Sequence, residues 1–186
     1  IQLTSGSAPS AAALNVGALD FNGTATLRLA GLIPTGVAYP VIHYTSLAGM
    51  GGFNPTVVGP QGLVATLSTN VAAQTIDVTV TSAGGIVWTG TNSTPGLTNL
   101  WDLNSTTNWL IGGSPTDYQE TTPPGDAVMF NDLGSGTVLL SNTASPSGVT
   151  ISNSAVNYAF QGTGNISGIG GLTKDAATKL CKTLQG

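Results

Sequence analysis

The acidic residues are the main source of acid–base chemistry in this chain. Five of the eight carboxylates fall within residues 102–132, namely Asp102, Asp117, Glu120, Asp126 and Asp132. Glycosidases act with two carboxyl groups, about 5–5.5 Å apart in retaining enzymes and about 6.5–9.5 Å apart in inverting ones. Asp117 and Glu120 lie close together in the sequence and are the candidate catalytic pair of a glycoside hydrolase. The alternative is structural: Asp102 and Asp126 lie where Asx turns are expected, and Asp132 ends a predicted strand.

Aromatic residues near these carboxylates suit a carbohydrate site. Trp101 and Trp109 precede the candidate pair and Tyr118 lies between its two members. Their rings could stack on a sugar, which makes these three residues a candidate non-catalytic binding platform. The alternative is that the tryptophans fill the core, because large aromatic side chains are on average well buried. Trp88, at the start of a predicted strand, is expected in the core.

Other reactive residue types are nearly absent. A single His43 and a single Cys181 exclude two-histidine metal sites, a disulfide framework and a multi-cysteine zinc site. No G-x-S-x-G motif accompanies His43, as a Ser–His–Asp triad of the hydrolase type would need, and no D-x-D-x-D-G pattern indicates calcium. We therefore expect no metal and no cofactor.

The charge of the chain limits its partners. Only 6% of residues are charged and the net charge is −4. The cations are Arg28, Lys174, Lys179 and Lys182. Nucleic acid requires several cationic contacts with its phosphates, so it is excluded as a partner. No apolar run reaches the ~18 residues of a transmembrane helix, so we expect no membrane insertion. Glycans or other surface proteins remain as expected partners.

Short alternating segments dominate the sequence. Hydrophobic residues make up 40% of the chain, and 26 glycines and 10 prolines supply turns. Apolar and polar residues alternate as in β-strands in residues 24–30, 63–68, 75–81, 86–89, 127–130, 136–140, 148–151 and 157–160. The pattern predicts an all-β protein: a sandwich, a barrel or a β-solenoid.

Composition divides the chain into residues 1–85, residues 86–174 and an atypical tail at 175–186. Residues 91–124 are poor in strand signals and predict a long loop, and long loops in compact proteins are often functional. The tail changes composition abruptly and contains the single cysteine. Because the chain begins with Ile1 rather than Met, we expect a mature fragment or an excised piece of a longer protein.

Motifs of the second part resemble a known repeat. They are Val87-Trp88-Thr89-Gly90, Trp101-Asp102, Asn108-Trp109, residues 124–132 (PGDAVMFND), Gly148-Val149-Thr150-Ile151, residues 158–162 (YAFQG), Ile166-Ser167-Gly168 and Gly171-Leu172-Thr173-Lys174. Together they resemble the autotransporter-associated β-strand repeats of passenger-type proteins, which are large secreted or surface proteins of Gram-negative and related bacteria. Residues 1–85 look like the closing segment of a preceding unit.

The resemblance implies a right-handed parallel β-solenoid, secreted or on the bacterial cell surface, with no catalytic residues. A β-sandwich or jelly roll is the alternative architecture. Our first expectation is a structural or adhesive repeat module, with a glycoside hydrolase and a carbohydrate-binding module as alternatives, because a fold does not fix a function. After Lys174 the tail departs from the repeat, and an open solenoid end exposes strand edges through which copies of the chain could associate.

Overall fold

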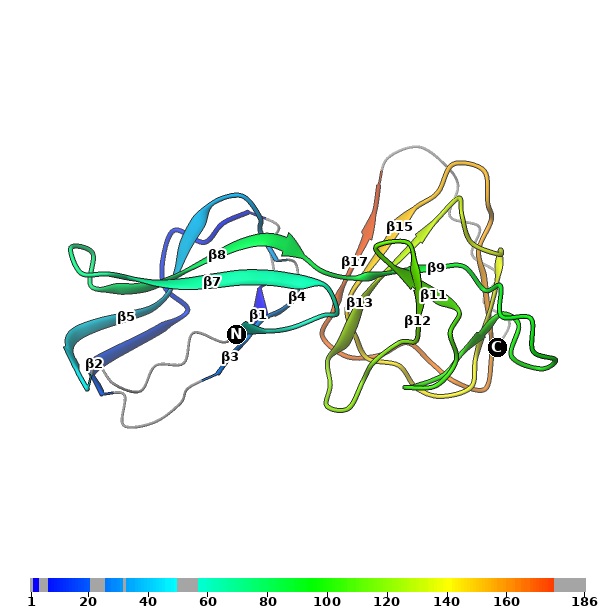
Figure 1. The fold of residues 1–186 in the computed structure, drawn as a ribbon, viewed down its shortest axis with the longest axis horizontal. Helices are drawn as coiled ribbons and strands as arrows, with labels where there is room; N and C mark the ends of the chain where they lie inside the picture. Colours follow the sequence, from blue (N-terminus) through cyan, green and yellow to red (C-terminus); the bar gives the residue numbers. More distant parts are fainter. Residues whose placement is uncertain (1, 4–6, 21–25, 32, 50–56, 176–186) are drawn as a thin grey trace. The chain divides into compact units, whose positions relative to one another are not determined.

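The protein is an all-β chain divided into two compact units. The computed structural model describes residues 2–3, 7–20, 26–31, 33–49 and 57–175. These residues form seventeen strands and no helix, which confirms the expected all-β class (Figure 1). The first unit is Ile1–Gly59 with Leu63–Gly84, and the second is Pro60–Gly62 with Gly85–Gly186. None of the described residues belongs to a helix long and apolar enough to cross a membrane.

The first unit begins with three parallel strand pairs that share nearly the same separation along the chain. They are β1 (Gln2–Leu3) with β4 (Ala30–Gly31), β2 (Leu14–Asp20) with β5 (Ala38–Ala48), and β3 (Leu27–Arg28) with β6 (Val57–Val58). Gln2 pairs with Ala30 and Leu14 with Ile42, each 28 positions apart, and Leu27 pairs with Val57, 30 positions apart. The strands β1, β2 and β3 therefore each lie beside a strand that is 28 or 30 positions later in the chain.

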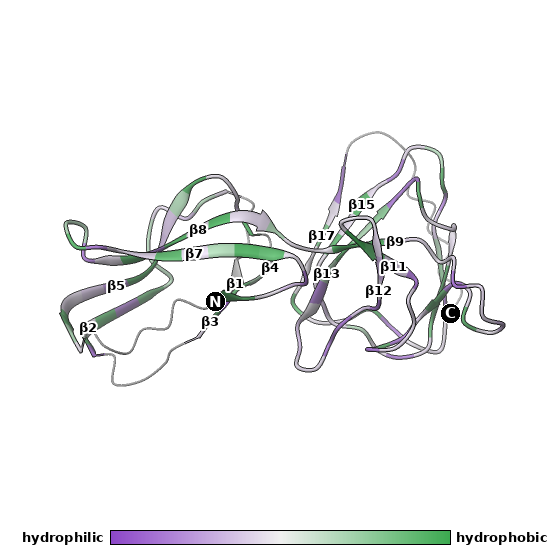
Figure 2. Ribbon diagram, viewed as in Figure 1, coloured by the Kyte–Doolittle hydropathy of each residue, from purple (hydrophilic) through white to green (hydrophobic). Residues whose placement is uncertain are grey.

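An antiparallel hairpin completes this unit. β7 (Leu63–Asn70) and β8 (Thr75–Ala83) pair with each other, and β8 also pairs antiparallel with β5, giving the sheet order β2-β5-β8-β7. Hydrophobic residues alternate with polar ones along most of β8, whereas β7 begins with the hydrophobic run Leu63-Val64-Ala65 (Figure 2). The buried side of β8 carries Ile76, Val78 and Val80, because alternate residues of a strand point to the same face.

The second unit is built on two sheets. One has the order β12-β11-β9-β13-β15-β17 and the other has the order β10-β14-β16. Their strands are β9 (Ile86–Trp88), β10 (Leu100–Trp101), β11 (Trp109–Ile111), β12 (Ser114–Thr116), β13 (Gly125–Asn131), β14 (Thr137–Leu140), β15 (Pro146–Ser152), β16 (Ala159–Gly162) and β17 (Gly171–Lys174). The segment 91–124, expected to be a loop, therefore contains the three short strands β10, β11 and β12.

Parallel pairing in the second unit recurs at a nearly constant separation. Val128 pairs with Val149, 21 positions later, and Val149 pairs with Leu172, 23 positions later. In the other sheet Val138 pairs with Phe160, and an isolated bridge joins Ala144 to Ile166, each 22 positions apart.

The sheets are nevertheless mixed rather than purely parallel. β11 runs antiparallel to both β9 and β12, so the hairpin β11–β12 lies along the outer edge of β9. In the first unit the hairpin β7–β8 lies along β5 in the same manner. Covering a strand edge with a hairpin satisfies backbone groups that would otherwise be free to pair with another chain.

Candidate functional site

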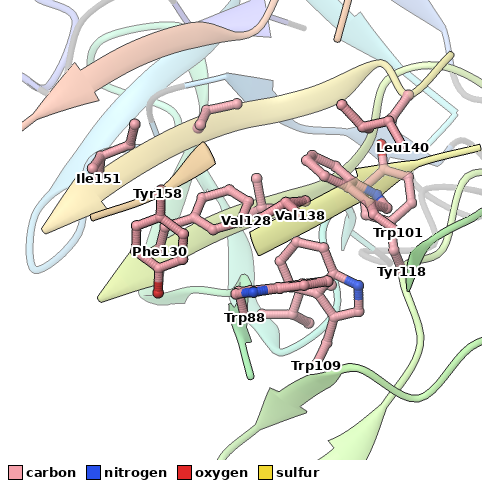
Figure 3. Close-up of a cluster of buried hydrophobic side chains, with 13 residues drawn as sticks. Trp88, Trp101, Trp109, Tyr118, Val128, Phe130, Val138, Leu140, Ile151 and Tyr158 are labelled. Carbon is pink, nitrogen blue, oxygen red and sulfur yellow. The ribbon is translucent and has the colours of Figure 1, made fainter. Parts of the chain in front are cut away.

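The three aromatic residues of the predicted binding platform lie inside the core of the second unit. Trp101, Trp109 and Tyr118 are all buried (Figure 3). The ring of Trp101 meets that of Trp109 at 5.1 Å and 77°, and that of Tyr118 at 5.3 Å and 74°. These are edge-to-face contacts, which aromatic pairs prefer. Stacking on a sugar requires an exposed ring face, and the structure places these rings against one another instead.

Trp88 extends this aromatic cluster, and its predicted core position is confirmed by its complete burial. Its ring contacts that of Trp109 at 4.9 Å and 74°, and its Nε1 donates a hydrogen bond to the carbonyl oxygen of Ser135 at 3.0 Å. A Cβ at Gly134 would lie 2.7 Å from Cδ1 of Trp88. The turn after β13 therefore needs glycine at this position in order to pass over the indole.

Glu120, one member of the predicted catalytic pair, connects Tyr118 to the segment that precedes β15. Its Oε2 accepts hydrogen bonds from the hydroxyl of Tyr118 at 2.6 Å and from the backbone nitrogen of Ser145 at 2.7 Å. Burial raises the pKa of Tyr118 far above its usual range, and the hydrogen bond to Glu120 and the charges of Glu120 and Asp126 raise it further. Tyr118 thus stays protonated and remains a donor to Glu120.

Asp117, the other member, has different partners. Its Oδ2 accepts from Nε2 of Gln119 at 2.6 Å, and its carbonyl oxygen accepts from Nε2 of Gln61 at 2.8 Å. Asp117 and Glu120 flank Tyr118 on one short segment, and their carboxylates have different hydrogen-bond partners.

Asp126 is the buried carboxylate of the group. Its Oδ1 accepts from the backbone nitrogen of Gln61 at 2.8 Å, while its Oδ2 accepts from Nε2 of Gln61 at 2.6 Å and from the backbone nitrogen of Gln119 at 2.9 Å. Thr116 donates to Oε1 of the same glutamine at 2.9 Å. Gln61 was not a predicted site residue, and nothing near it in the sequence indicates so many partners.

Asp132 and Asp102 each stabilise a turn. Asp132 is exposed, and its carboxylate accepts from the Ser154 hydroxyl at 2.6 Å and from the backbone nitrogens of Ser154, Ala155 and Val156 at 2.8–3.0 Å. The Ser154 hydroxyl, followed by these amides, holds the pKa of Asp132 well below its usual range. Asp102 accepts hydrogen bonds from the backbone nitrogen of Thr106 at 2.9 Å and from the Thr106 hydroxyl at 2.7 Å. These bonds span four residues, whereas the expected Asx turn bonds to the backbone two residues on.

Asn108 organises the connection between β9 and β10. Its buried side chain donates to the carbonyl oxygens of Leu97 at 2.6 Å and Leu100 at 2.8 Å, and accepts from the backbone nitrogen of Asn92 at 2.8 Å. Its own carbonyl oxygen accepts from the backbone nitrogen of Thr89 at 2.9 Å. An asparagine side chain has both hydrogen-bond donors and an acceptor. Asn108 can therefore hold several parts of residues 89–100 in place at once.

His43 lies half-buried within β5, and Cys181 lies outside the described residues. In the described part of the chain, no three His, Cys, Asp or Glu residues form a group that could hold a metal ion. Comparison with protein-family models, with curated proteins and with solved structures found no match to this chain.

Proposed function

We propose that the chain is a structural module of a secreted or cell-surface bacterial protein, built as a right-handed β-solenoid of the autotransporter-associated repeat type. The recurrence of parallel pairing every 21–23 residues in the second unit carries this proposal. A solenoid stacks one turn of chain on the next, so each position meets its counterpart one turn later. The right hand follows from the strong preference of parallel crossover connections for that hand.

The hydrogen bonds of the carboxylates support a passive role. Glu120, Asp126 and Asp132 each accept backbone hydrogen bonds from segments distant in sequence, at Ser145, Gln61 and Ser154 respectively. Such bonds stabilise connections between strands, and a charged acceptor makes them stronger than neutral ones. The module would space or present other parts of its protein through its stiffness.

Disulfide trapping tests the solenoid register. Met129 pairs directly with Thr150 in the parallel sheet, and Met129 is partly exposed. In a Cys181→Ser background, Met129→Cys with Thr150→Cys should form a disulfide on mild oxidation, since neighbouring strands bring Cα atoms within bridging distance. The matched control is Met129→Cys with Ser152→Cys, two residues out of register, which should bridge far less. Equal bridging in both variants, or none in the first, would contradict this register.

An activity assay separates the module from the glycosidase alternative. The purified chain should not hydrolyse a broad panel of chromogenic glycosides, and Asp117→Asn and Glu120→Gln should leave that result unchanged. Hydrolysis that is lost in either variant would establish an enzyme and overturn the proposal. Binding to a glycan array without hydrolysis would instead support the carbohydrate-binding alternative.

A further inference from the structure

The side-chain amide of Gln61 is fixed at both its nitrogen and its oxygen within the second unit. Nε2 donates to Oδ2 of Asp126 at 2.6 Å and to the carbonyl oxygen of Asp117 at 2.8 Å, while Oε1 accepts from the hydroxyl of Thr116 at 2.9 Å. Its backbone nitrogen donates to Oδ1 of Asp126 at 2.8 Å, and its carbonyl oxygen accepts from the nitrogen of Gly85 at 2.7 Å. The amide carbon Cδ is therefore held between a hydroxyl group and a buried carboxylate.

The Thr116 hydroxyl lies within reach of this carbon. A C=O bond is about 1.23 Å long, so the 2.9 Å contact with Oε1 places Oγ1 of Thr116 no more than about 4.1 Å from Cδ of Gln61. Reacting atoms in a near-attack arrangement are about 3–3.5 Å apart, and a small movement of the threonine side chain closes this difference. Well-oriented groups within one molecule react as if present at about 10⁵–10⁸ M, so a reaction that is negligible between separate molecules proceeds within one fold.

Asp126 is placed to move the proton that such a reaction must transfer. An alcohol is a weak nucleophile and requires a base. Once Oγ1 of Thr116 has added to Cδ, this oxygen and Nε2 are substituents of the same carbon, and Oδ2 of Asp126 already lies 2.6 Å from Nε2. The same carboxylate oxygen can thus take the hydroxyl proton as a general base and give it to the departing nitrogen as a general acid. Asp126 is 3% exposed, and the exclusion of water strengthens its electrostatic effect on the reacting groups.

We propose that Thr116 and Gln61 form an intramolecular ester, with Asp126 as the group that transfers the proton. Oγ1 of Thr116 bonds to Cδ of Gln61, the Cδ–Nε2 bond breaks, and the nitrogen leaves as ammonia with the hydroxyl proton. One alcohol and one amide thus give one ester and one ammonia, without an oxidant or any other reactant. The structure shows the chain before this step. Asp126 afterwards keeps its hydrogen bonds from the backbone nitrogens of Gln61 and Gln119.

This inference goes beyond the proposed structural role, because it assigns a covalent cross-link to the second unit. The bond joins β12 to the segment before β7, across 55 positions of sequence. A chain with a single cysteine has no internal disulfide, and an ester closes a loop in the same way, which stabilises the fold by restricting the unfolded chain. The reaction takes place once in each chain, so it does not require the rate of an enzyme.

Intact-mass spectrometry provides the first test. After storage at neutral pH, the full chain should be lighter than its 18.5 kDa sequence mass by one ammonia. Thr116→Val removes the nucleophile at nearly the same size and should restore the full sequence mass, whereas Thr116→Ser keeps a hydroxyl and should still lose ammonia. Ser135→Ala is the matched control, since the Ser135 hydroxyl donates to the amide oxygen of Asn99, and it should lose ammonia like the parent. A folded parent at full sequence mass overturns the proposal, as does ammonia loss that persists in Thr116→Val or disappears in Ser135→Ala.

Peptide chemistry identifies the bond. Proteolysis of the denatured parent should give one linked species that contains Gln61 and Thr116. Mild alkaline hydroxylamine should split this isolated species, because it cleaves esters and leaves ordinary amides intact. Asp126→Asn should slow the appearance of the linked species by about 10²-fold or more, since general acid–base catalysis contributes roughly 10²–10⁴-fold; circular dichroism verifies that each variant is folded. A parent without the linked species, or with one that resists hydroxylamine, refutes the ester, and an unchanged rate in Asp126→Asn refutes the role of that carboxylate.

Discussion

Asp126 accepts hydrogen bonds from both the backbone nitrogen and the side-chain nitrogen of Gln61, at 2.8 and 2.6 Å, across 65 positions of sequence. The carboxylate is buried and no cation accompanies it in these bonds. The two acceptor oxygens instead match two donors of one residue, which gives the pair the geometry of a bidentate contact. Residues Pro60–Gly62 thereby become part of the second unit.

Removing this contact should destabilise the second unit. Asp126→Ala leaves the donors of Gln61 and Gln119 without their acceptor in a partly buried setting, and we expect it to lower the free energy of unfolding by roughly 1–3 kcal/mol. All three tryptophans of the chain lie in the second unit, so tryptophan fluorescence during denaturant unfolding reports on that unit.

A double-mutant cycle with Gln61→Ala isolates the pair. We expect an interaction free energy of about 0.5–3 kcal/mol between Asp126 and Gln61. Gln119→Ala is the control, since it removes a side chain that bonds to Asp117 and not to Asp126. Additive effects of the two substitutions would show that the contact contributes nothing of its own.

The aromatic cluster should determine stability rather than binding. Trp109→Ala removes a buried ring in contact with Trp88, Trp101 and Phe130, and such truncations cost roughly 3–5 kcal/mol. Far-UV circular dichroism during denaturation measures this loss. Leu133→Ala, at an exposed position, should change stability by less than about 0.5 kcal/mol. Loss of glycan binding at unchanged stability in Trp109→Ala would point to a stacking platform instead.

Asp132 should make stability depend on acidic pH. Its pKa is lower in the folded protein than in the unfolded chain, where it is about 3.9. The carboxylate therefore contributes stability that is fully present above about pH 5 and is lost as the pH falls through the folded pKa. Asp132→Asn should be less stable than the parent at neutral pH, and the difference should shrink progressively below about pH 5. Denaturant unfolding at a series of pH values checks this, and a pH-independent difference would contradict it.

Tyr158 should show the opposite dependence at alkaline pH. Burial, followed by the charge of Asp132, raises its pKa to about 12, above its ordinary value of about 10. The protonated phenol thus contributes stability that is present below about pH 10 and lost as the pH rises towards 12. Ultraviolet titration of the tyrosines should show a phenol that ionises near pH 12 and whose signal is absent in Tyr158→Phe. In Asp132→Asn the same group should titrate earlier, and an unchanged midpoint would exclude the contribution of Asp132.

Strands in which apolar and polar residues alternate regularly could be predicted from the sequence, and the other strands could not. The patterns at residues 75–81 and 127–130 correspond to β8 and β13, because one buried face imposes a two-residue period. β5 is missing from the alternating segments because it carries Pro40 and a register shift between Pro40 and Ile42. β10, β11 and β12 are only two or three residues long, too short for any periodicity to appear.

The candidate site was predictable only in part. The cluster of carboxylates between residues 102 and 132 does mark an organised region, but residue type alone does not distinguish a catalytic acid from a hydrogen-bond acceptor in a turn. The two roles are distinguished by hydrogen-bond partners that lie far away in the sequence. Ser145 is 25 positions from Glu120, and Gln61 is 65 positions from Asp126. Pairings over such distances are set by the stacking of strands and leave no local pattern in the sequence.

The strand register has a consequence for how such a chain can change during evolution. Ile86 pairs with Val128, 42 positions later, which is twice the 21 positions between Val128 and Val149. The connection between β9 and β13 is thus about one such separation longer and contains the hairpin β11–β12, while β9 and β13 remain neighbours. Insertions and deletions at the corners of the stack need not disturb the ladder of paired strands. Exposed corners should therefore tolerate changes of length better than the paired strands do.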